Sequence, residues 1–256
     1  MTLEVQDVTV RFGGFTALSA ISVSLQPGRI LAVIGPNGSG KSTLFNSITG
    51  LVPVQSGRVT VNGEDISATP SFQRIRRGIS RTFQTPRIDP EMTVQTSVLC
   101  GLYSARKQGL LSTMLGTGAA RREERGLRER SLEILRSLDL HHLSGVRMGE
   151  LPIGQVRMVD VARAIAASPK YLLLDEPAAG LSHEELRVLA AQIRRVAASG
   201  AGVLLVEHNF HLVKELAEDV VVLNLGTRLL SGKPDQIAQH PEFIKVYLGT
   251  SGEVAQ

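Results

Sequence analysis

A glycine-rich segment carries the strongest chemical signal in the sequence. Its residues are Gly35, Pro36, Asn37, Gly38, Ser39, Gly40, Lys41, Ser42 and Thr43. The first eight match the phosphate-binding loop pattern GxxxxGK[ST], in which backbone N–H groups turn toward the phosphates of a nucleotide. Lys41 supplies an ammonium for the β and γ phosphates, and Ser42 supplies a hydroxyl for Mg²⁺. We therefore expect a site for a nucleotide and its Mg²⁺ ion.

Two adjacent acids, Asp175 and Glu176, follow an apolar run of strand length. Ligands of open α/β sheets bind where the strands end, so both carboxylates are expected at the ligand edge. Asp175 fits the acid that orients hydrated Mg²⁺, and Glu176 is placed to accept a proton from an attacking water. Alone, such a pair is more often a solvated strand end or a helix cap. Together with the phosphate-binding loop, it predicts hydrolysis.

The pattern of apolar residues predicts the elements that position these groups. Strands are expected at residues 3–12, 21–25, 29–34, 58–61, 171–174, 203–206 and 220–223, and helices at 41–49 and 184–198. Asn62 and Gly63 predict a hairpin turn. Strands that alternate with helices favour a parallel sheet with crossover connections. The phosphate-binding loop then lies between a strand and a helix, which is its expected context.

The middle of the chain has a different pattern. From about residue 92 to residue 151 apolar residues recur at helical spacing, so a helical insert is expected within an α/β body formed by residues 1–91 and 152–256. Residues 109–118 are rich in Gly, Ser and Thr and are expected to connect parts of this insert. All 256 residues are expected to form a single domain.

The composition excludes several classes of protein. With 256 residues and 43% apolar content, the chain can bury a substantial core. It lacks both the apolar run of roughly 18 residues that a membrane-spanning helix needs and the pattern of a signal peptide. The single cysteine, Cys100, lies in an apolar run and is expected to be a small buried side chain. A scattered net charge of +4 and the absence of Trp argue against nucleic-acid binding.

The order of the motifs resembles that of the ATP-binding subunits of ABC transporters over nearly the whole chain. The resemblance implies ATP and Mg²⁺ as cofactors. Gln84 resembles the residue of the family's Q-loop that senses Mg²⁺ or water and touches the membrane subunit. His208 resembles the switch histidine that contacts the γ-phosphate, and Phe12 resembles the aromatic platform for adenine, although its ring can also fill core. The implied catalytic residues are Lys41, Glu176 and His208, and the implied metal-site residues are Ser42, Gln84 and Asp175.

A further segment occupies the place of the family signature, which caps the γ-phosphate bound by the opposite subunit of a head-to-tail dimer. Its residues are Leu151, Pro152, Ile153, Gly154 and Gln155. Pro152 and Ile153 replace the usual serine and first glycine, so a hydroxyl donor is lost, whereas backbone N–H groups and the start of the next helix can still serve. Ser182 stands where most relatives have an aspartate, so communication across the dimer interface is expected to differ.

These departures are similar to those in the ATP-binding subunits of branched-chain amino acid importers. The resemblance implies an ATPase at the cytoplasmic face of the membrane that works with permease subunits and an external substrate-binding protein. It favours a heterodimer with a second ATPase subunit, and a homodimer remains open. Other amino acids, urea and short amides also remain open as cargoes. The observed motifs disfavour a soluble ABC ATPase, a P-loop kinase or GTPase, and a non-hydrolysing member of the family.

Overall fold

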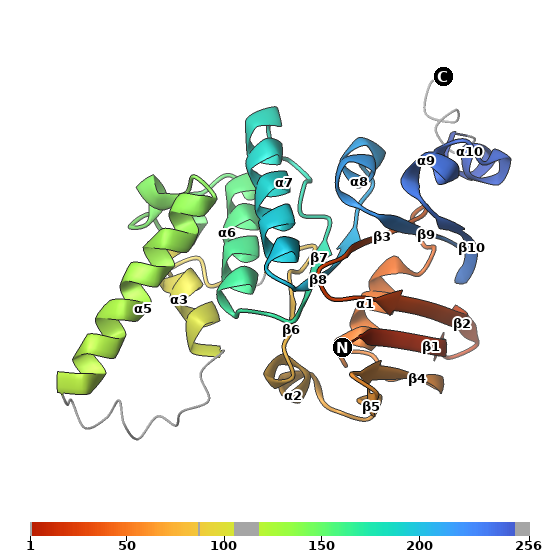
Figure 1. Cartoon of the computed structure of the whole chain (residues 1–256), viewed down its shortest axis with the longest axis horizontal. Coiled ribbons are helices and arrows are strands. Elements are labelled where there is room, and N and C mark those ends of the chain that lie inside the picture. Colours follow the sequence, from red (N-terminus) through yellow and green to blue (C-terminus); the bar gives the residue numbers. More distant parts are fainter. Residues whose placement is uncertain (1, 87, 105–117, 249–256) are drawn as a thin grey trace.

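A computed structural model of the chain describes residues 2–86, 88–104 and 118–248. Two β-sheets and several helices form a mixed α/β fold, in which the larger sheet runs through the middle of the molecule (Figure 1). Helices α6 (Ile153–Ala166) and α7 (His183–Ala198) lie on one side of this sheet. Helix α1 (Lys41–Ile48) and the smaller sheet lie on the other side.

The smaller sheet is antiparallel and contains the predicted early strands. Its strands, in spatial order, are β2 (Phe15–Leu25), β1 (Leu3–Phe12), β4 (Ser56–Val61) and β5 (Glu64–Asp65). Asn62 has a positive φ of 56° and Gly63 one of 82°, as expected for the hairpin turn between β4 and β5. The predicted turn and strands are therefore confirmed.

The central sheet carries the predicted buried strands. In spatial order they are β10 (Thr227–Gly232), β9 (Asp219–Asn224), β3 (Ile30–Ile34), β8 (Gly202–Val206), β7 (Tyr171–Asp175) and β6 (Ile79–Arg81). All neighbouring pairs from β9 to β6 are parallel, and only β10 at the edge is antiparallel. Since parallel strands end at the same edge, the segments that follow β3, β7 and β8 meet there.

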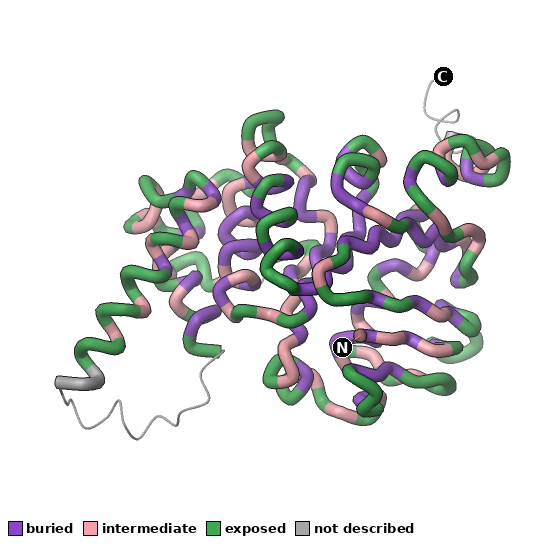
Figure 2. The backbone as a smooth tube through the Cα atoms, in the orientation of Figure 1, coloured by how far each residue is buried: buried purple, intermediate pink, exposed green. Residues whose placement is uncertain are grey.

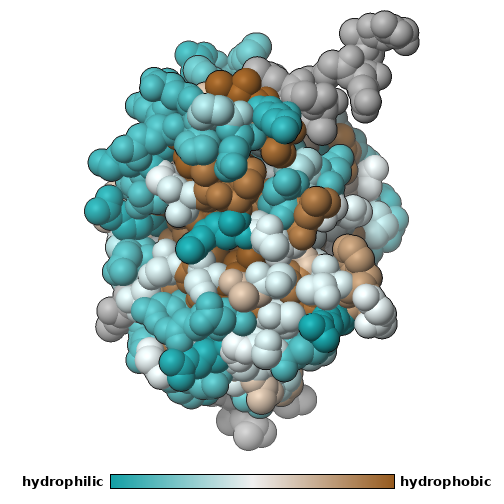
Figure 3. Space-filling model, turned by 90° about the vertical axis from the view of Figure 1, so that its right-hand side faces the viewer, coloured by the Kyte–Doolittle hydropathy of each residue, from teal (hydrophilic) through white to brown (hydrophobic). Residues whose placement is uncertain are grey.

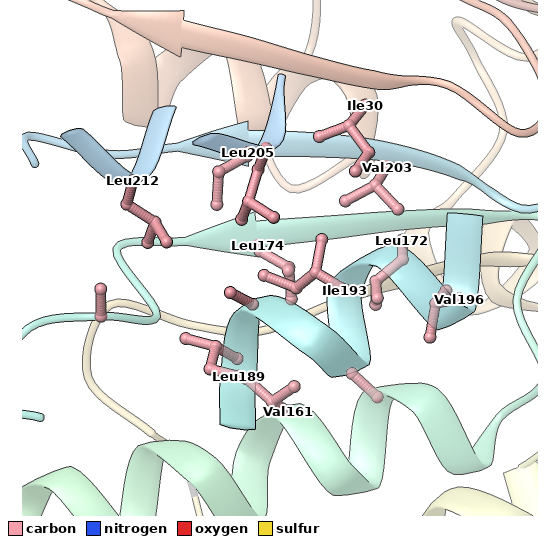
Figure 4. Close-up of a cluster of buried hydrophobic side chains, with 14 of the residues drawn as sticks. Ile30, Val161, Leu172, Leu174, Leu189, Ile193, Val196, Val203, Leu205 and Leu212 are labelled. Atoms are coloured by element: carbon pink, nitrogen blue, oxygen red, sulfur yellow. The ribbon is translucent and has the colours of Figure 1, made fainter. Parts of the chain in front are cut away.

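Alternate residues of the central strands enter two separate cores. Leu172 and Leu174 of β7 pack on the α6 and α7 side, whereas Tyr171 and Leu173 pack toward α1 and the smaller sheet. Figure 4 shows Leu172 and Leu174 directed toward Ile193 of α7. Buried residues follow the central strands and the inner sides of the helices, and exposed residues lie outside them (Figure 2). Burial on both faces explains why these strands are continuous apolar runs in the sequence.

Further helices complete the layers. They are α2 (Ser71–Arg76), α3 (Val94–Ser104), α5 (Gly118–Ser137), α8 (Phe210–Leu216), α9 (Pro234–Ala238) and α10 (Pro241–Leu248), with the short helices η1 (His141–Leu143) and η2 (Met148–Glu150). Helices therefore occupy the segment where the apolar spacing predicts them. The predicted connection at residues 109–118 lies outside the described residues, except that α5 begins at Gly118. Within the described ranges, no helix is long and apolar enough to cross a membrane.

One expectation from the sequence is wrong. Cys100 is exposed and not buried. In α3 the buried apolar residues are Val94, Val98 and Leu102, which recur every four residues and form one stripe facing the core. Cys100 is two residues from both Val98 and Leu102, so it lies on the opposite side of the helix.

Candidate nucleotide site

The glycine-rich segment forms the loop between β3 and the start of α1. A Cβ added at Gly35 would lie 2.1 Å from the carbonyl oxygen of Leu223, and one added at Gly40 would lie 2.8 Å from that of Ala17. Gly40 also has a φ of +104°, which L side chains rarely adopt. Ser39 is buried, and its Oγ has no hydrogen-bond partner within the described part of the chain. The loop is thus a close-fitting turn with an unused hydroxyl, which suits an anionic ligand.

Lys41 is buried at the first position of α1. Its Nζ donates hydrogen bonds to the carbonyl oxygens of Gly35, at 2.8 Å, and Pro36, at 2.9 Å. Burial lowers the pKa of Lys41, whereas the nearby negative charges of Glu176 and Asp175 oppose that decrease. The ammonium is therefore held inside the loop, where phosphate oxygens would solvate it in place of water.

Asp175 ends β7 and is almost fully buried. Its Oδ1 has no hydrogen-bond partner among the described residues, and its Oδ2 lies 3.6 Å from Arg81 Nη2. Burial raises the pKa of Asp175, and the positive charge of Arg81 opposes that increase. A buried carboxylate oxygen without a partner is costly unless a ligand uses it. Together with the exposed hydroxyl of Ser42, this oxygen fits the oxygen-donor set that Mg²⁺ prefers.

Glu176 contacts two of the polar side chains that the family resemblance assigns to the site. Its Oε1 lies 2.8 Å from His208 Nε2, and its Oε2 accepts a hydrogen bond from Gln84 Nε2 at 3.3 Å. The backbone of Glu176 has a positive φ of 48°, a costly conformation for this residue type. Its N–H donates to the carbonyl of Val206 at 2.9 Å, which fixes this turn against the end of β8. Side chains from two other loops therefore converge on the Glu176 carboxylate.

A cavity of about 280 Å³ lies beside these groups. It is lined by Asn37 to Thr43 of the glycine-rich segment and by Phe12, Phe15, Ala17, Gln84 and Glu176. Phe12 and Phe15 are 52% and 66% exposed, so both rings can contact a flat ligand at the surface. No motif in the sequence pointed to Phe15.

On the side of the molecule that carries β10, hydrophobic side chains reach the surface in patches between hydrophilic ones (Figure 3).

The signature segment lies elsewhere. None of Leu151, Pro152, Ile153, Gly154 and Gln155 is among the residues that line the cavity. Pro152 is the N-cap of α6, Ile153 is 56% exposed, and Gly154 packs so closely that an added Cβ would lie 2.6 Å from the carbonyl oxygen of Gly180. Ser182 is the N-cap of α7 and forms a capping box with Glu185, so the departure at this position has a structural role.

Two further groups at the site were not predicted from the sequence. Arg81 Nη1 donates to Asn46 Oδ1 of α1 at 2.7 Å, so its guanidinium links α1 to the end of β7. Asp160 of α6 is buried, and its Oδ2 accepts a hydrogen bond from the N–H of Phe83 at 3.1 Å. In the sequence, only the proximity of Arg81 to Gln84 points to the first of these groups. The buried Asp160 had no such neighbour.

Comparisons with known proteins agree with this geometry. The family model described as ABC transporter matches residues 18–179, which is more than half of the chain. The chain belongs to the ABC transporter family. Like other members, this ABC protein is an ATP-binding ATPase. A crystal structure of a nucleotide-free ATP-binding cassette from an ABC transporter superposes with a TM-score of 0.83 at 32% identity, covering 96% of this chain and 99% of that one.

Two relatives of this ABC protein are similar over nearly their full length. The high-affinity branched-chain amino acid transport ATP-binding protein BraF of Pseudomonas aeruginosa is 36% identical over 248 residues, which cover 96% of this chain and 97% of BraF. The corresponding protein LivG of Escherichia coli is 35% identical over 250 residues, with the same coverage of both chains. The ATP-binding cassette fold predicted from the motifs is therefore confirmed.

Proposed function

We propose that this chain is the ATP-hydrolysing subunit of an importer for branched-chain amino acids. The observation that carries the proposal is the convergence of Lys41, Asp175, Glu176, Gln84 and His208 beside one cavity at the carboxyl ends of the central strands. The names of BraF and LivG support the choice of cargo. ATP and Mg²⁺ are the proposed cofactors, and membrane permease subunits are the proposed partners.

The residues of the glycine-rich segment hold the nucleotide. Their backbone N–H groups and the ammonium of Lys41 bind the β and γ phosphates, while Phe12 stacks on the adenine. Ser42, Gln84 and Asp175 hold the metal ion. Bound Mg²⁺ supplies charge neutralisation to the phosphates during hydrolysis.

Glu176 accepts the proton of the attacking water. His208 Nε2 lies 2.8 Å from its Oε1 and orients the carboxylate from one side, while Gln84 orients it from the other. His208 also contacts the γ-phosphate in this proposal. A carboxylate that is already held on two sides loses less conformational entropy when it orients the attacking water toward the γ-phosphate. This positioning is a main contribution to the catalysis of phosphoryl transfer.

A second cavity supports docking of a permease close to Gln84. Its volume is about 270 Å³, and its lining includes Leu51, Ile75, Phe83 and Cys100. Leu51 and Ile75 are exposed apolar side chains, so an inserted segment of a partner would remove them from water. Phe83 precedes Gln84 directly, and a partner in this cavity would therefore act on the catalytic loop. We place the subunit peripherally at the cytoplasmic face of the membrane, in a complex that includes a substrate-binding protein.

The proposed complex also contains a second ATPase subunit. The segment from Leu151 to Gln155 lies outside the cavity of its own chain, as expected for a cap on the nucleotide of an opposite subunit. Because Pro152 cannot donate a hydrogen bond, we favour a non-identical partner, and a homodimer is the alternative. The mass of purified Glu176→Gln protein with and without Mg-ATP separates the two: a doubled mass shows self-pairing, and a monomer that binds ATP favours the heterodimer.

ATP turnover tests the enzymatic part of the proposal. The Lys41→Ala variant should lose nucleotide binding or turnover, because it removes the cation that faces the phosphates. Glu176→Gln should bind ATP normally while hydrolysis falls by roughly 10² to 10⁴. Turnover that stays near normal in both variants would contradict the assignment of this site.

Uptake by whole cells tests the cargo. Cells whose own copy of the gene carries Glu176→Gln should take up less labelled leucine, isoleucine and valine, while uptake of labelled urea stays unchanged. Loss of urea uptake with normal amino-acid uptake would support an importer of urea or short amides instead. No change in any cargo would argue against a transport role.

A further inference from the structure

Glu207 is a buried acid that the proposed mechanism does not use. It lies between β8 and α8, directly before His208, and is 3% exposed. Its Oε1 accepts a hydrogen bond from the N–H of Ala178 at 2.9 Å, and its Oε2 accepts one from the N–H of His208 at 3.2 Å. The N–H of Asn209 lies 3.5 Å from the same Oε2. One carboxylate therefore joins two loops that leave neighbouring strands.

The loop that Glu207 contacts leads from the end of β7 to α7. Helix α6 holds the same loop from another side, because the guanidinium of Arg157 donates a hydrogen bond to the carbonyl of Ala179. The first turn of α6 also packs against Gly180. The loop thus has two supports, one from the helix that begins with the signature segment and one from Glu207.

An acid is a costly choice at this position. Burial raises the pKa of Glu207, and the negative charge of Glu176 adds to the increase, whereas the three backbone N–H groups oppose it. A buried carboxylate is tolerated only where hydrogen bonds replace its water. The partners of Glu207 are backbone N–H groups of the two loops that carry Glu176 and His208. These hydrogen bonds offset the desolvation of the carboxylate and at the same time hold the two loops in fixed positions.

Aromatic rings link α10 to the segment that carries this acid. Phe210 of α8 packs on Phe243 of α10 with ring centroids 5.0 Å apart, and Phe243 packs on Tyr247 at 4.6 Å. Burial and the negative charge of Glu207 raise the pKa of Tyr247 to about 12, so the phenol remains neutral beside the carboxylate. These rings connect α10 to the helix that follows His208.

We propose that Glu207 is a positioning residue for ATP hydrolysis. Its carboxylate fixes the backbone of His208 relative to the loop that follows Glu176, and so keeps the two side chains at hydrogen-bonding distance. This inference rests on the proposed function, because it assigns Glu207 to the same catalytic centre. Glu207 acts through His208 and Ala178 and does not touch the nucleotide.

The test compares Glu207→Ala and Glu207→Gln with the wild-type protein. Alanine removes every acceptor, whereas glutamine retains one oxygen for one of the two loops, so kcat should fall in the order Glu, Gln, Ala. Misplacement by about 1 Å costs roughly 10²-fold in rate, so a fall of about 10- to 100-fold is expected for Glu207→Ala. Binding of a fluorescent ATP analogue should stay within about threefold, since the phosphate contacts remain.

Glu218→Gln is a matched control. The Glu218 carboxylate also accepts a hydrogen bond from a backbone N–H, that of Ile30, but at the start of β3 and away from the cavity. It should lower the melting temperature with little effect on kcat. An unchanged kcat in Glu207→Ala would overturn the inference. So would a fall in kcat that follows the fall in melting temperature equally in Glu207→Ala, Glu207→Gln and Glu218→Gln, because loss of stability alone would then explain it. Wild-type turnover in the same assay tests the proposed function separately.

Discussion

His208 Nε2 lies 2.8 Å from Glu176 Oε1, although 32 residues separate them in the chain. Each follows the end of one of two neighbouring parallel strands, β7 and β8, and the register pairs Asp175 with Val206. The parallel register brings the loops after both strands to the same level of the sheet edge. The pairing of base and histidine is thus a direct consequence of strand order.

His208→Ala should lower kcat by about 10² to 10³, because Glu176 loses one of its two orienting contacts and the phosphate loses a polar neighbour. Steady-state ATPase assays measure the loss. His211→Ala is the matched control, since His211 is exposed on the next helix and no motif includes it. Equal rates in the two variants would remove His208 from the mechanism.

Gly154→Ala should lower the rate of ATP turnover in protein that remains folded. The added methyl would lie 2.6 Å from the carbonyl oxygen of Gly180, so α6 and the loop after Glu176 must separate. We expect a fall in kcat of at least about tenfold, because displacement of about 1 Å at a catalytic loop has effects of this size or larger.

Gly126→Ala is the control for this substitution. Gly126 lies inside α5, and an added Cβ there meets nothing within 4 Å. Alanine at this position should stabilise the protein by up to about 1 kcal/mol and leave turnover unchanged. If Gly154→Ala also keeps full turnover, the contact between α6 and the loop is not required for hydrolysis.

Arg74 is predicted to be a main stabiliser of the region around α1. Only 2% of it is exposed, and its guanidinium donates to the carbonyl oxygens of Ser47 and Ile48, both at 2.7 Å, and of Thr69 and Ser67, both at 2.8 Å. Two of these carbonyls belong to the last turn of α1, where a cation is favourable.

Arg74→Ala leaves these buried acceptors without a donor and should lower the free energy of unfolding by about 3 kcal/mol. For a domain of this size, that corresponds to a fall in melting temperature of about 6–12 °C. Arg74→Lys should recover only part of the lost stability, because an ammonium cannot reproduce the planar set of N–H donors of the guanidinium. The exposed Arg76→Ala is the control, with an expected change within about 0.5 kcal/mol. Similar losses from Arg74→Ala and Arg76→Ala would contradict the role of Arg74.

The sequence predicts the local features well because they depend on short-range patterns. Strand β8 and the part of β7 that precedes Asp175 consist of apolar residues, because both faces of the sheet are buried. The pattern of the glycine-rich segment likewise predicts its loop conformation. The four-residue spacing of Val94, Val98 and Leu102 also indicates the exposure of Cys100, whereas the apolar composition of the run suggests burial, which is wrong.

Long-range polar contacts are the part that the sequence does not predict. Phe83 and Asp160 are 77 residues apart, and Glu207 and Ala178 are 29 apart. No spacing rule connects such pairs, because their contact depends on how α6 and β8 pack in the finished fold. A buried acid within an apolar helix is still a local inconsistency, and Asp160 shows that such a residue is worth testing as a structural link.

The pH dependence of stability tests the environment of Asp160. Burial raises the pKa of this acid above its ordinary value, while the positive charges of Arg163 and Arg81 and the N–H of Phe83 oppose the increase. Because the folded-state pKa is higher than that of the unfolded chain, the folded protein binds more protons between the two values. The contribution of Asp160 to stability is therefore largest at low pH and falls as the pH rises through this interval.

Asp160→Asn removes this titration while keeping the shape of the protonated acid. Urea unfolding across pH 4.5 to 7.5 should show wild-type stability decreasing with pH relative to Asp160→Asn, because ionisation in the buried site costs free energy only in the wild type. Glu123→Gln, at an exposed position of α5, serves as the control for removing a carboxylate from the surface. A difference between wild type and Asp160→Asn that grows in favour of the wild type with pH would show that the pairing with Arg163 outweighs burial.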